Sequence, residues 1–170
     1  MRNIKLTLAY DGTNFCGFEL QPGKRSIRRE IEKALFKIFK TRVKIINASR
    51  TDARVHALCQ VINFRIKSSI PTSRIAAALN SCLPEEIRVI KAREQARGFH
   101  ARYSPKTKVY EYLIYNGEIL PPFYRKLVWH VKPKLDLAAM RKAAKVLQGK
   151  HDFSSFCASG SDDKNFVKTL

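Results

Sequence analysis

Alternating apolar and polar positions open the chain and predict a strand over Ile4–Tyr10. The next stretch, Asp11–Arg25, contains three glycines and one proline, which predicts a long loop of the kind that is usually functional or disordered. Ser26 can then cap a helix, because its hydroxyl can accept a hydrogen bond from an amide of the first turn. Apolar residues follow at helical spacing, at Ile27, Ile31, Ala34, Leu35 and Ile38.

Four further elements complete a first unit. Val43–Ala48 is rich in β-branched residues and Gln60–Lys67 alternates apolar with polar side chains, so both are predicted strands. A helix is expected from Ser73 to about Leu83, and Ile87–Ala92 is the fourth predicted strand. This order of elements is that of the ferredoxin-like (split βαβ) unit, an α+β fold with both helices on one face of an antiparallel sheet. The other sheet face is expected to be free, and such a face can hold RNA.

The pattern becomes less regular after residue 94. Residues 95–107 mix cations with Phe99 and Tyr103, a mixture that suits contacts to RNA phosphates and unpaired bases but also occurs in ordinary interdomain linkers. Strands are predicted over Val109–Asn116 and Leu127–Val131. A helix capped by Asp136 follows, and its expected inward positions are Leu137, Met140, Ala144 and Leu147, with Gly149 just past its end.

The end of the chain carries weaker signals. His151–Phe156 is expected to be a short loop or turn, and Asn165–Leu170 to begin a strand after a turn at Gly160–Lys164. The expected domains are therefore a ferredoxin-like domain over 1–94, a basic connector over 95–107, and the first part of a C-terminal α+β domain, cut short, over 108–170.

The net charge of the chain indicates which classes of binding partner to expect. Lys and Arg number 33 against 14 Asp and Glu, a formal net charge of +19. Such an excess favours a polyanionic partner, since cations near phosphates strengthen binding by releasing counterions. Nucleic acid is the preferred partner. The alternatives are a basic surface kept for solubility and binding to an anionic membrane. No stretch reaches the roughly 20 apolar residues of a membrane span and Met1–Tyr10 does not resemble a signal peptide, so a cytoplasmic protein is expected.

The cysteines and histidines give no metal signature. Cys16, Cys59, Cys82 and Cys157 lie far apart with no Cys-x-x-Cys pair, and the four histidines show no paired ligand spacing. Reduced, mostly buried thiols and no metal site are therefore expected.

One loop, Ser49–Ala57, carries the best candidate for catalysis. It lies between two predicted strands, and Asp52 is its only acid, with Arg50, Arg54, Arg65 and Lys67 nearby in sequence. A carboxylate in such a positive field is expected to stay ionised and is a candidate catalytic group. The alternative is a structural role, in which the Asp52 side chain caps a turn.

Three segments together resemble one family. They are Ser49-Arg50-Thr51-Asp52-Ala53-Arg54-Val55-His56, Tyr10–Phe18, and Phe99–Ser104 followed by Tyr110–Asn116. They resemble, in the same order, motifs of the TruA family of tRNA pseudouridine synthases. The resemblance implies the pseudouridine synthase fold, an isomerase that converts uridine to pseudouridine at positions 38 to 40 of the tRNA anticodon stem-loop, and a homodimer.

The resemblance also implies residue roles. Asp52 takes the position of the catalytic carboxylate, and no cofactor is required, because the isomerisation neither consumes nor releases a group. Arg50 is the residue expected to enter the space of the flipped base or bind the adjacent phosphate, and Tyr110 is expected to pack against the target base. The expected RNA-binding residues are Arg102, His100 and Arg54. The sequence leaves open whether Asp52 attacks the sugar, attacks the pyrimidine, or acts as a base.

The chain departs from the family pattern at three loop positions. Ser49 and Arg54 stand where the family has glycines, and Phe18 where it usually has tryptophan. Arg54 matters most, because glycine can adopt backbone angles that arginine reaches only with strain. No position here matches the basic residue that the family supplies from its C-terminal segment to pair with the catalytic Asp. A non-catalytic basic RNA-binding module, or an inactive fragment of such an enzyme, is therefore the alternative function.

Overall fold

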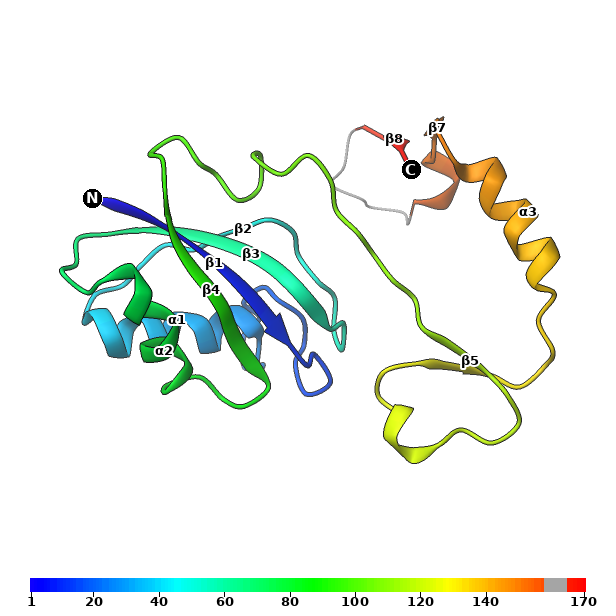
Figure 1. Ribbon diagram of the computed structural model, residues 1–170, viewed down its shortest axis with the longest axis horizontal. Helices are drawn as coiled ribbons and strands as arrows, with labels where there is room; N and C mark the ends of the chain where they lie inside the picture. Colours follow the sequence, from blue (N-terminus) through cyan, green and yellow to red (C-terminus); the bar gives the residue numbers. More distant parts are fainter. Residues whose placement is uncertain (158–164) are drawn as a thin grey trace. The chain divides into compact units, whose positions relative to one another are not determined.

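The computed structural model describes residues 1–157 and 165–170, and these form two compact units, Met1–Tyr110 and Glu111–Leu170. Each unit is described separately. The first unit is a mixed α+β structure of four strands and two helices (Figure 1). Its elements are β1 (Arg2–Tyr10), α1 (Ile27–Phe39), β2 (Ile46–Asn47), β3 (Ala57–Ile66), α2 (Thr72–Asn80) and β4 (Ile87–Gln95).

The four strands form one antiparallel sheet in the order β2-β3-β1-β4. Strand β1 is central, with Leu6 opposite Ile62 of β3 and Ala92 of β4. The predicted strand Val43–Ala48 shortens to Ile46–Asn47, and beyond it the Ala48 amide still donates to the Val61 carbonyl of β3 at 2.9 Å. The other three predicted strands are confirmed, although β3 begins directly at Ala57 and β4 continues to Gln95.

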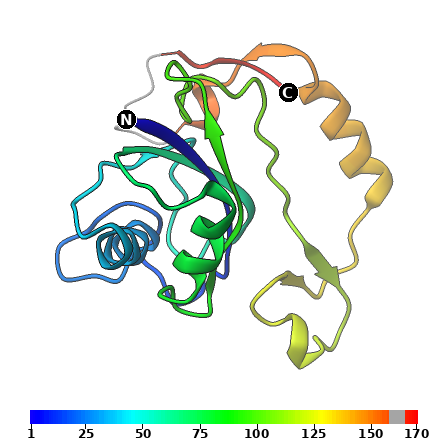
Figure 2. The ribbon, with the colours of Figure 1, turned by 60° about the vertical axis from the view of Figure 1, so that its left-hand side comes forward.

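The core lies between the sheet and the two helices, which Figures 1 and 2 show on the same face of the sheet. The Ser26 hydroxyl caps α1 as predicted, accepting a hydrogen bond from the Arg29 amide at 3.4 Å. Fully buried side chains from β1, β3 and the helices pack there, at about 1.5–3 kcal/mol of stabilisation for each large apolar one. They include Ile4, Leu6, Leu8, Ile27, Ile31, Leu35, Ile62, Phe64, Ile75 and Leu79.

The opposite face of the sheet is partly covered, so the prediction of a free face is wrong there. Asn3 and Asn63 are 2% and 1% exposed. The side-chain Nδ2 of Asn63 donates to Asn3 Oδ1 at 2.8 Å, and the backbone amide of Ala101 donates to Asn63 Oδ1 at 2.8 Å. Asn3 Nδ2 also donates to the carbonyls of Ala96 and Phe99. Buried polar groups need partners, and these two side chains find them in one bond to each other and in the connector backbone, which they bind to the sheet.

The second unit contains short elements only. They are β5 (Ile114–Asn116), a 3-10 turn (Pro122–Tyr124), β6 (Trp129–Val131), α3 (Leu137–Leu147), β7 (Lys150–Asp152), a second 3-10 turn (Ser154–Phe156) and β8 (Val167–Thr169). Strands β5 and β6 pair in parallel, and β7 and β8 pair antiparallel. The predicted strand Val109–Asn116 is thus reduced to its last three residues, and the loop predicted at His151–Phe156 contains β7 and a 3-10 turn.

Helix α3 has the predicted bounds but not the predicted burial. The Asp136 carboxylate accepts hydrogen bonds from the amides of Ala138 and Ala139, as a capping residue should. Leu137, Met140 and Leu147, expected to point inward, are 57%, 42% and 39% exposed, so the expectation of burial is wrong. None of the described residues of this unit is buried. The turn predicted at Gly160–Lys164 lies outside the described residues.

Candidate active site

The Asp52 loop and the Asp11–Arg25 loop are joined by backbone hydrogen bonds. The Phe18 amide donates to the Thr51 carbonyl at 2.9 Å, and the Arg54 amide donates to the Phe15 carbonyl at 3.2 Å. The Tyr10 hydroxyl lies 2.9 Å from Thr51 Oγ1. Two of the three segments singled out in the sequence therefore meet at the ends of β1 and β3.

Two glycines permit this contact. A Cβ atom on Gly17 would lie 2.8 Å from the Thr51 carbonyl oxygen, and one on Gly12 would lie 2.0 Å from that of Val55. Gly17 also has φ +98°, in the left-handed region that side chains rarely adopt. Any side chain at these positions would push the two loops apart.

The base of the Asp52 loop is held by one buried and one half-buried polar side chain, those of Gln60 and Asn47. The side-chain amides of Asn47 and Gln60 both donate to the Ser49 carbonyl, at 3.0 and 2.9 Å. Burial raises the pKa of the Tyr10 phenol, against a smaller lowering by hydrogen bonds to Thr51 and Gln60. Tyr10 therefore remains a neutral hydrogen-bonding group at physiological pH, positioning Thr51 next to Asp52.

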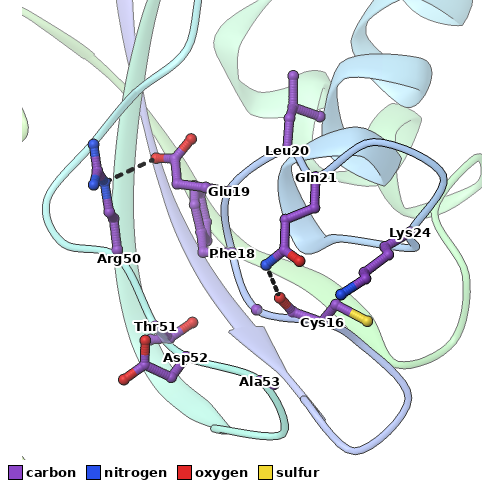
Figure 3. Close-up of a pocket in the computed structure, with 11 residues that line it drawn as sticks. Cys16, Phe18, Glu19, Leu20, Gln21, Lys24, Arg50, Thr51, Asp52 and Ala53 are labelled. Atoms are coloured by element: carbon purple, nitrogen blue, oxygen red, sulfur yellow. Dashed lines mark hydrogen bonds and ion pairs between the residues drawn. The ribbon is translucent and has the colours of Figure 1, made fainter.

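Asp52 lies exposed at the edge of an open hollow of about 570 Å³ (Figure 3). Residues 16–21 and Lys24 line it from the first loop, and residues 50–53 from the second. Among the described residues, none donates a hydrogen bond to the Asp52 carboxylate or forms an ion pair with it. The turn that follows is closed by backbone, with the Val55 amide donating to the Asp52 carbonyl at 3.3 Å. The capping role considered for this side chain is therefore not observed, and its oxygens remain available to a ligand.

Arg50 extends toward Glu19 instead of Asp52 (Figure 3). Its Nε lies 4.0 Å from Glu19 Oε1, and the other Glu19 oxygen accepts from Arg28 Nη1 of α1 at 2.9 Å. Burial lowers the pKa of Arg28, but hydrogen bonds to Glu32 and Glu19 outweigh it and raise that pKa overall. Arg28 is thus a fixed positive charge that holds Glu19. Sequence reasoning missed Glu19, although it is the only acid besides Asp11 in the long loop.

Arg54 has the backbone angle that its family position suggested. Its φ is +66°, one of two positive values at non-glycine residues in the described chain. Such a conformation costs roughly 1–2 kcal/mol for a residue with a Cβ. The Arg54 side chain is exposed beside the loop that carries Asp52.

Three contacts anchor the rim of the first loop. His56 Nδ1 lies 3.2 Å from Asp11 Oδ1. Arg25 donates to Glu86 at 2.9 and 3.3 Å and covers the Phe15 ring at 4.3 Å. The hydrogen bond from Arg25 is the main cause that lowers the pKa of Glu86, and the same bond raises the pKa of Arg25. This ion pair attaches the loop to the start of β4.

The connector presents a small aromatic and basic cluster. The His100 and Tyr103 rings stack with centroids 4.5 Å apart, and the Arg102 guanidinium lies 5.9 Å from the Tyr103 ring centre. Tyr103 is 75% exposed. The buried Asn3 and Asn63 side chains hold the backbone beneath this cluster.

Tyr110 and Tyr112 are 67% and 87% exposed, so neither ring is part of a core in the described structure. They precede β5 and lie in extended chain, at the boundary of the two units. Tyr110 is therefore available to a ligand, but no contact links it to the Asp52 hollow in the described residues.

The exposure of the cysteines and the positions of possible metal ligands test two further expectations. Cys59 and Cys157 are exposed while Cys16 and Cys82 are half-buried, so the expectation of mostly buried thiols is wrong. In residues 1–157 and 165–170, no three His, Cys, Asp or Glu side chains are grouped to hold a metal ion. No helix in this described part is both long and apolar enough to cross a membrane.

Comparisons with known proteins identify related sequences. A family model described as tRNA pseudouridine synthase matches residues 7–104, which include the sheet, both loops and the connector. A protein named tRNA pseudouridine synthase A from Caldicellulosiruptor saccharolyticus is 45% identical over 170 residues, covering all of this chain and 70% of the relative. A tRNA pseudouridine synthase A 2 from Clostridium perfringens has the same identity and coverage, and a tRNA pseudouridine synthase A from Thermoanaerobacter is 42% identical with equal coverage.

Proposed function

The chain belongs to the tRNA pseudouridine synthase family, and on that premise we propose that it acts on uridines of the tRNA anticodon stem-loop with Asp52 as the catalytic carboxylate. The enzyme class, an isomerase that forms pseudouridine in tRNA, follows from the family. One observation carries the assignment of Asp52. Its carboxylate is exposed in a hollow and makes no hydrogen bond or ion pair to the described protein, while the backbone around it is held at several points.

The reaction explains why such a carboxylate is needed. The bond from ribose C1′ to uracil N1 breaks, the base turns, C1′ joins C5, and the proton lost from C5 is balanced by one gained at N1. The target base must first leave its stack, which brings it within reach of a side chain in a surface hollow. A free carboxylate can then act as a nucleophile or as a base. A carboxylate already occupied as a turn cap would serve neither purpose.

The neighbouring residues support a substrate site. Arg50 is 70% exposed and linked only weakly to Glu19, so it can swing toward a phosphate or the space left by the flipped base. Tyr110 supplies an exposed ring for packing against the target base. His100, Arg102 and Arg54 are proposed RNA contacts, because the first two form the exposed connector cluster and the third lies on the Asp52 loop.

The finer architecture is also part of the proposal. The antiparallel order β2-β3-β1-β4 with both helices on one face supports a ferredoxin-like first domain. We further propose cytoplasmic action on tRNA and a homodimer, both from the family resemblance. The sedimentation coefficient of the purified chain tests the dimer, since a monomer near 19.5 kDa would contradict it.

The first experiment is incubation of the chain with unmodified tRNA, followed by carbodiimide mapping of pseudouridine. The parent chain is expected to form product in the anticodon stem-loop. Asp52→Asn is expected to bind tRNA with nearly normal affinity and to form no product, because the substitution keeps the shape of the side chain and removes its negative charge. Glu85→Gln, which changes an exposed acid outside the hollow, is the matched control and should keep full activity.

Two outcomes would overturn the proposal. Product formation by Asp52→Asn would show that the Asp52 carboxylate is not required for the reaction. A folded parent chain that binds tRNA and forms no product would favour the alternative of a binding module or inactive fragment.

A further inference from the structure

A second open hollow, here called the α1 groove, lies on the outer side of α1. It involves none of the proposed catalytic or RNA-binding residues. It is lined by Leu20, Arg29, Glu32, Lys33, Phe36, Arg42, Val43 and Lys44.

The helical repeat produces one wall of the α1 groove. Arg29, Lys33 and Phe36 share one face of α1, while Ile27 and Ile31 are buried on the other. The second wall is the segment 42–44, which leads from α1 to β2. Phe36 is 52% exposed, so an aromatic ring is presented at a basic surface.

The α1 groove has an excess of positive charge. Its four cations are Arg29, Lys33, Arg42 and Lys44, and its one acid, Glu32, accepts a hydrogen bond from Arg28 at 2.8 Å. Lys33 pairs with Glu30 at 3.0 Å. Arg42 and Lys44 are exposed and form no ion pair with any residue that the structure describes. Two cations with no acidic partner in the described chain favour an anionic ligand.

The α1 groove and the Asp52 hollow share one lining residue. Leu20 lines both, and it is 47% exposed on the loop between them. Its neighbour Gln21 lines the Asp52 hollow, and the Gln21 carbonyl accepts a hydrogen bond from Arg29 of the α1 groove at 3.0 Å. An extended ligand that occupied both hollows would therefore have to pass over Leu20, which is exposed.

We propose that the α1 groove binds the phosphate backbone of the RNA strand that leaves the Asp52 hollow. Arg42 and Lys44 contact phosphates there, and Phe36 offers a face on which a neighbouring base can stack. This inference rests on the proposed function, since it assumes that the Asp52 hollow takes a nucleotide. It adds a binding surface that extends the site along α1.

The test is a binding measurement with unmodified tRNA at several salt concentrations. The double variant Arg42→Gln with Lys44→Gln is expected to bind about tenfold more weakly at physiological salt, and the slope of log affinity against log salt should fall by about two, one for each lost phosphate contact. Both side chains are exposed and unpaired in the described structure, so the thermal unfolding of the variant should match that of the parent.

The control is the double variant Lys67→Gln with Arg74→Gln, which removes the same charge from exposed positions that line neither hollow. It should keep parental affinity within about twofold, since isolated surface charges are screened. Equal losses in both double variants would overturn the proposal in favour of a general charge effect, and an unchanged affinity in the Arg42 and Lys44 variant would also overturn it. Loss of binding to phosphatidylserine vesicles with tRNA binding intact would assign the groove to membranes instead.

Binding is measured without turnover, so the proposal for the α1 groove and the proposal for the catalytic role of Asp52 are tested independently. Turnover by Asp52→Asn would refute the proposed mechanism while the salt slopes still report on the α1 groove. If the Arg42→Gln and Lys44→Gln variant kept the parental salt slope and Asp52→Asn formed no product, only the proposal for the α1 groove would be refuted.

Discussion

The two units of this chain use their hydrophobic residues in opposite ways. In Met1–Tyr110, most large apolar side chains of β1, β3 and α1 are enclosed between sheet and helices. In Glu111–Leu170, none of the described residues is buried, and Trp129 and Phe123 are 65% and 86% exposed. Since burial of apolar surface is the main source of stability, the first unit holds nearly all the stability of the described structure. The Asp52 hollow lies entirely in that stable unit, as a preorganised site requires.

The largest expected effect comes from the core itself. Phe64→Ala removes a fully buried ring from β3 and should lower the free energy of unfolding by about 3–5 kcal/mol. The matched change in the second unit, Phe123→Ala, should alter it by less than about 0.5 kcal/mol, because that ring is already in solvent. Urea unfolding of both variants measures the difference. Similar losses of unfolding free energy in the two variants would show that the second unit is packed in solution and would contradict the difference between the two units.

An intermediate effect is expected where the two loops meet. Gly17→Ala would bring a methyl group within 2.8 Å of the Thr51 carbonyl and strain a positive φ, at a cost of about 1–3 kcal/mol. Displacing Asp52 by even a small distance should also reduce kcat by about a hundredfold.

Gly149→Ala is the control for this change, since Gly149 also has a positive φ but its nearest neighbour, His151 Nε2, would lie 3.5 Å from the new Cβ. It should show backbone strain of about 1 kcal/mol and normal turnover. Unfolding curves and pseudouridine yields check both variants. A normal kcat for Gly17→Ala would mean that the packing of the loops does not position the site.

The smallest effect concerns the ion pair between Arg25 and Glu86. Since this contact lowers the pKa of Glu86, it stabilises the fold above the pKa of the unfolded carboxyl, and the stabilisation is lost as pH falls through the lower folded pKa. Arg25 is 39% exposed, so solvent reduces the contribution to about 0.5 kcal/mol. Glu86→Gln should thus be less stable than the parent at pH 7 and equal to it in strong acid. Urea midpoints at both pH values measure this, with exposed Glu85→Gln as the control, and a pH-independent difference would contradict it.

Local signals predicted much of the fold. Alternation along Ile4–Tyr10, helical spacing after Ser26 and the capping carboxylate of Asp136 each act within a few residues, so their elements appear as expected. The positive φ of Arg54 was suggested instead by the resemblance to a family that has glycine at this position. Short strands were overestimated, because pairing partners decide how far Val43–Ala48 and Val109–Asn116 extend.

The sequence by itself determined the order of elements in the first unit, the basic charge and the candidacy of Asp52, because these depend on composition and on spacing along the chain. Only the tertiary structure decided that Arg50 turns to Glu19, that Asn63 holds the connector and that Leu20 lines two hollows. Each of these contacts joins residues far apart in sequence. Their formation depends on which backbone segments the core brings together, and no local periodicity records that.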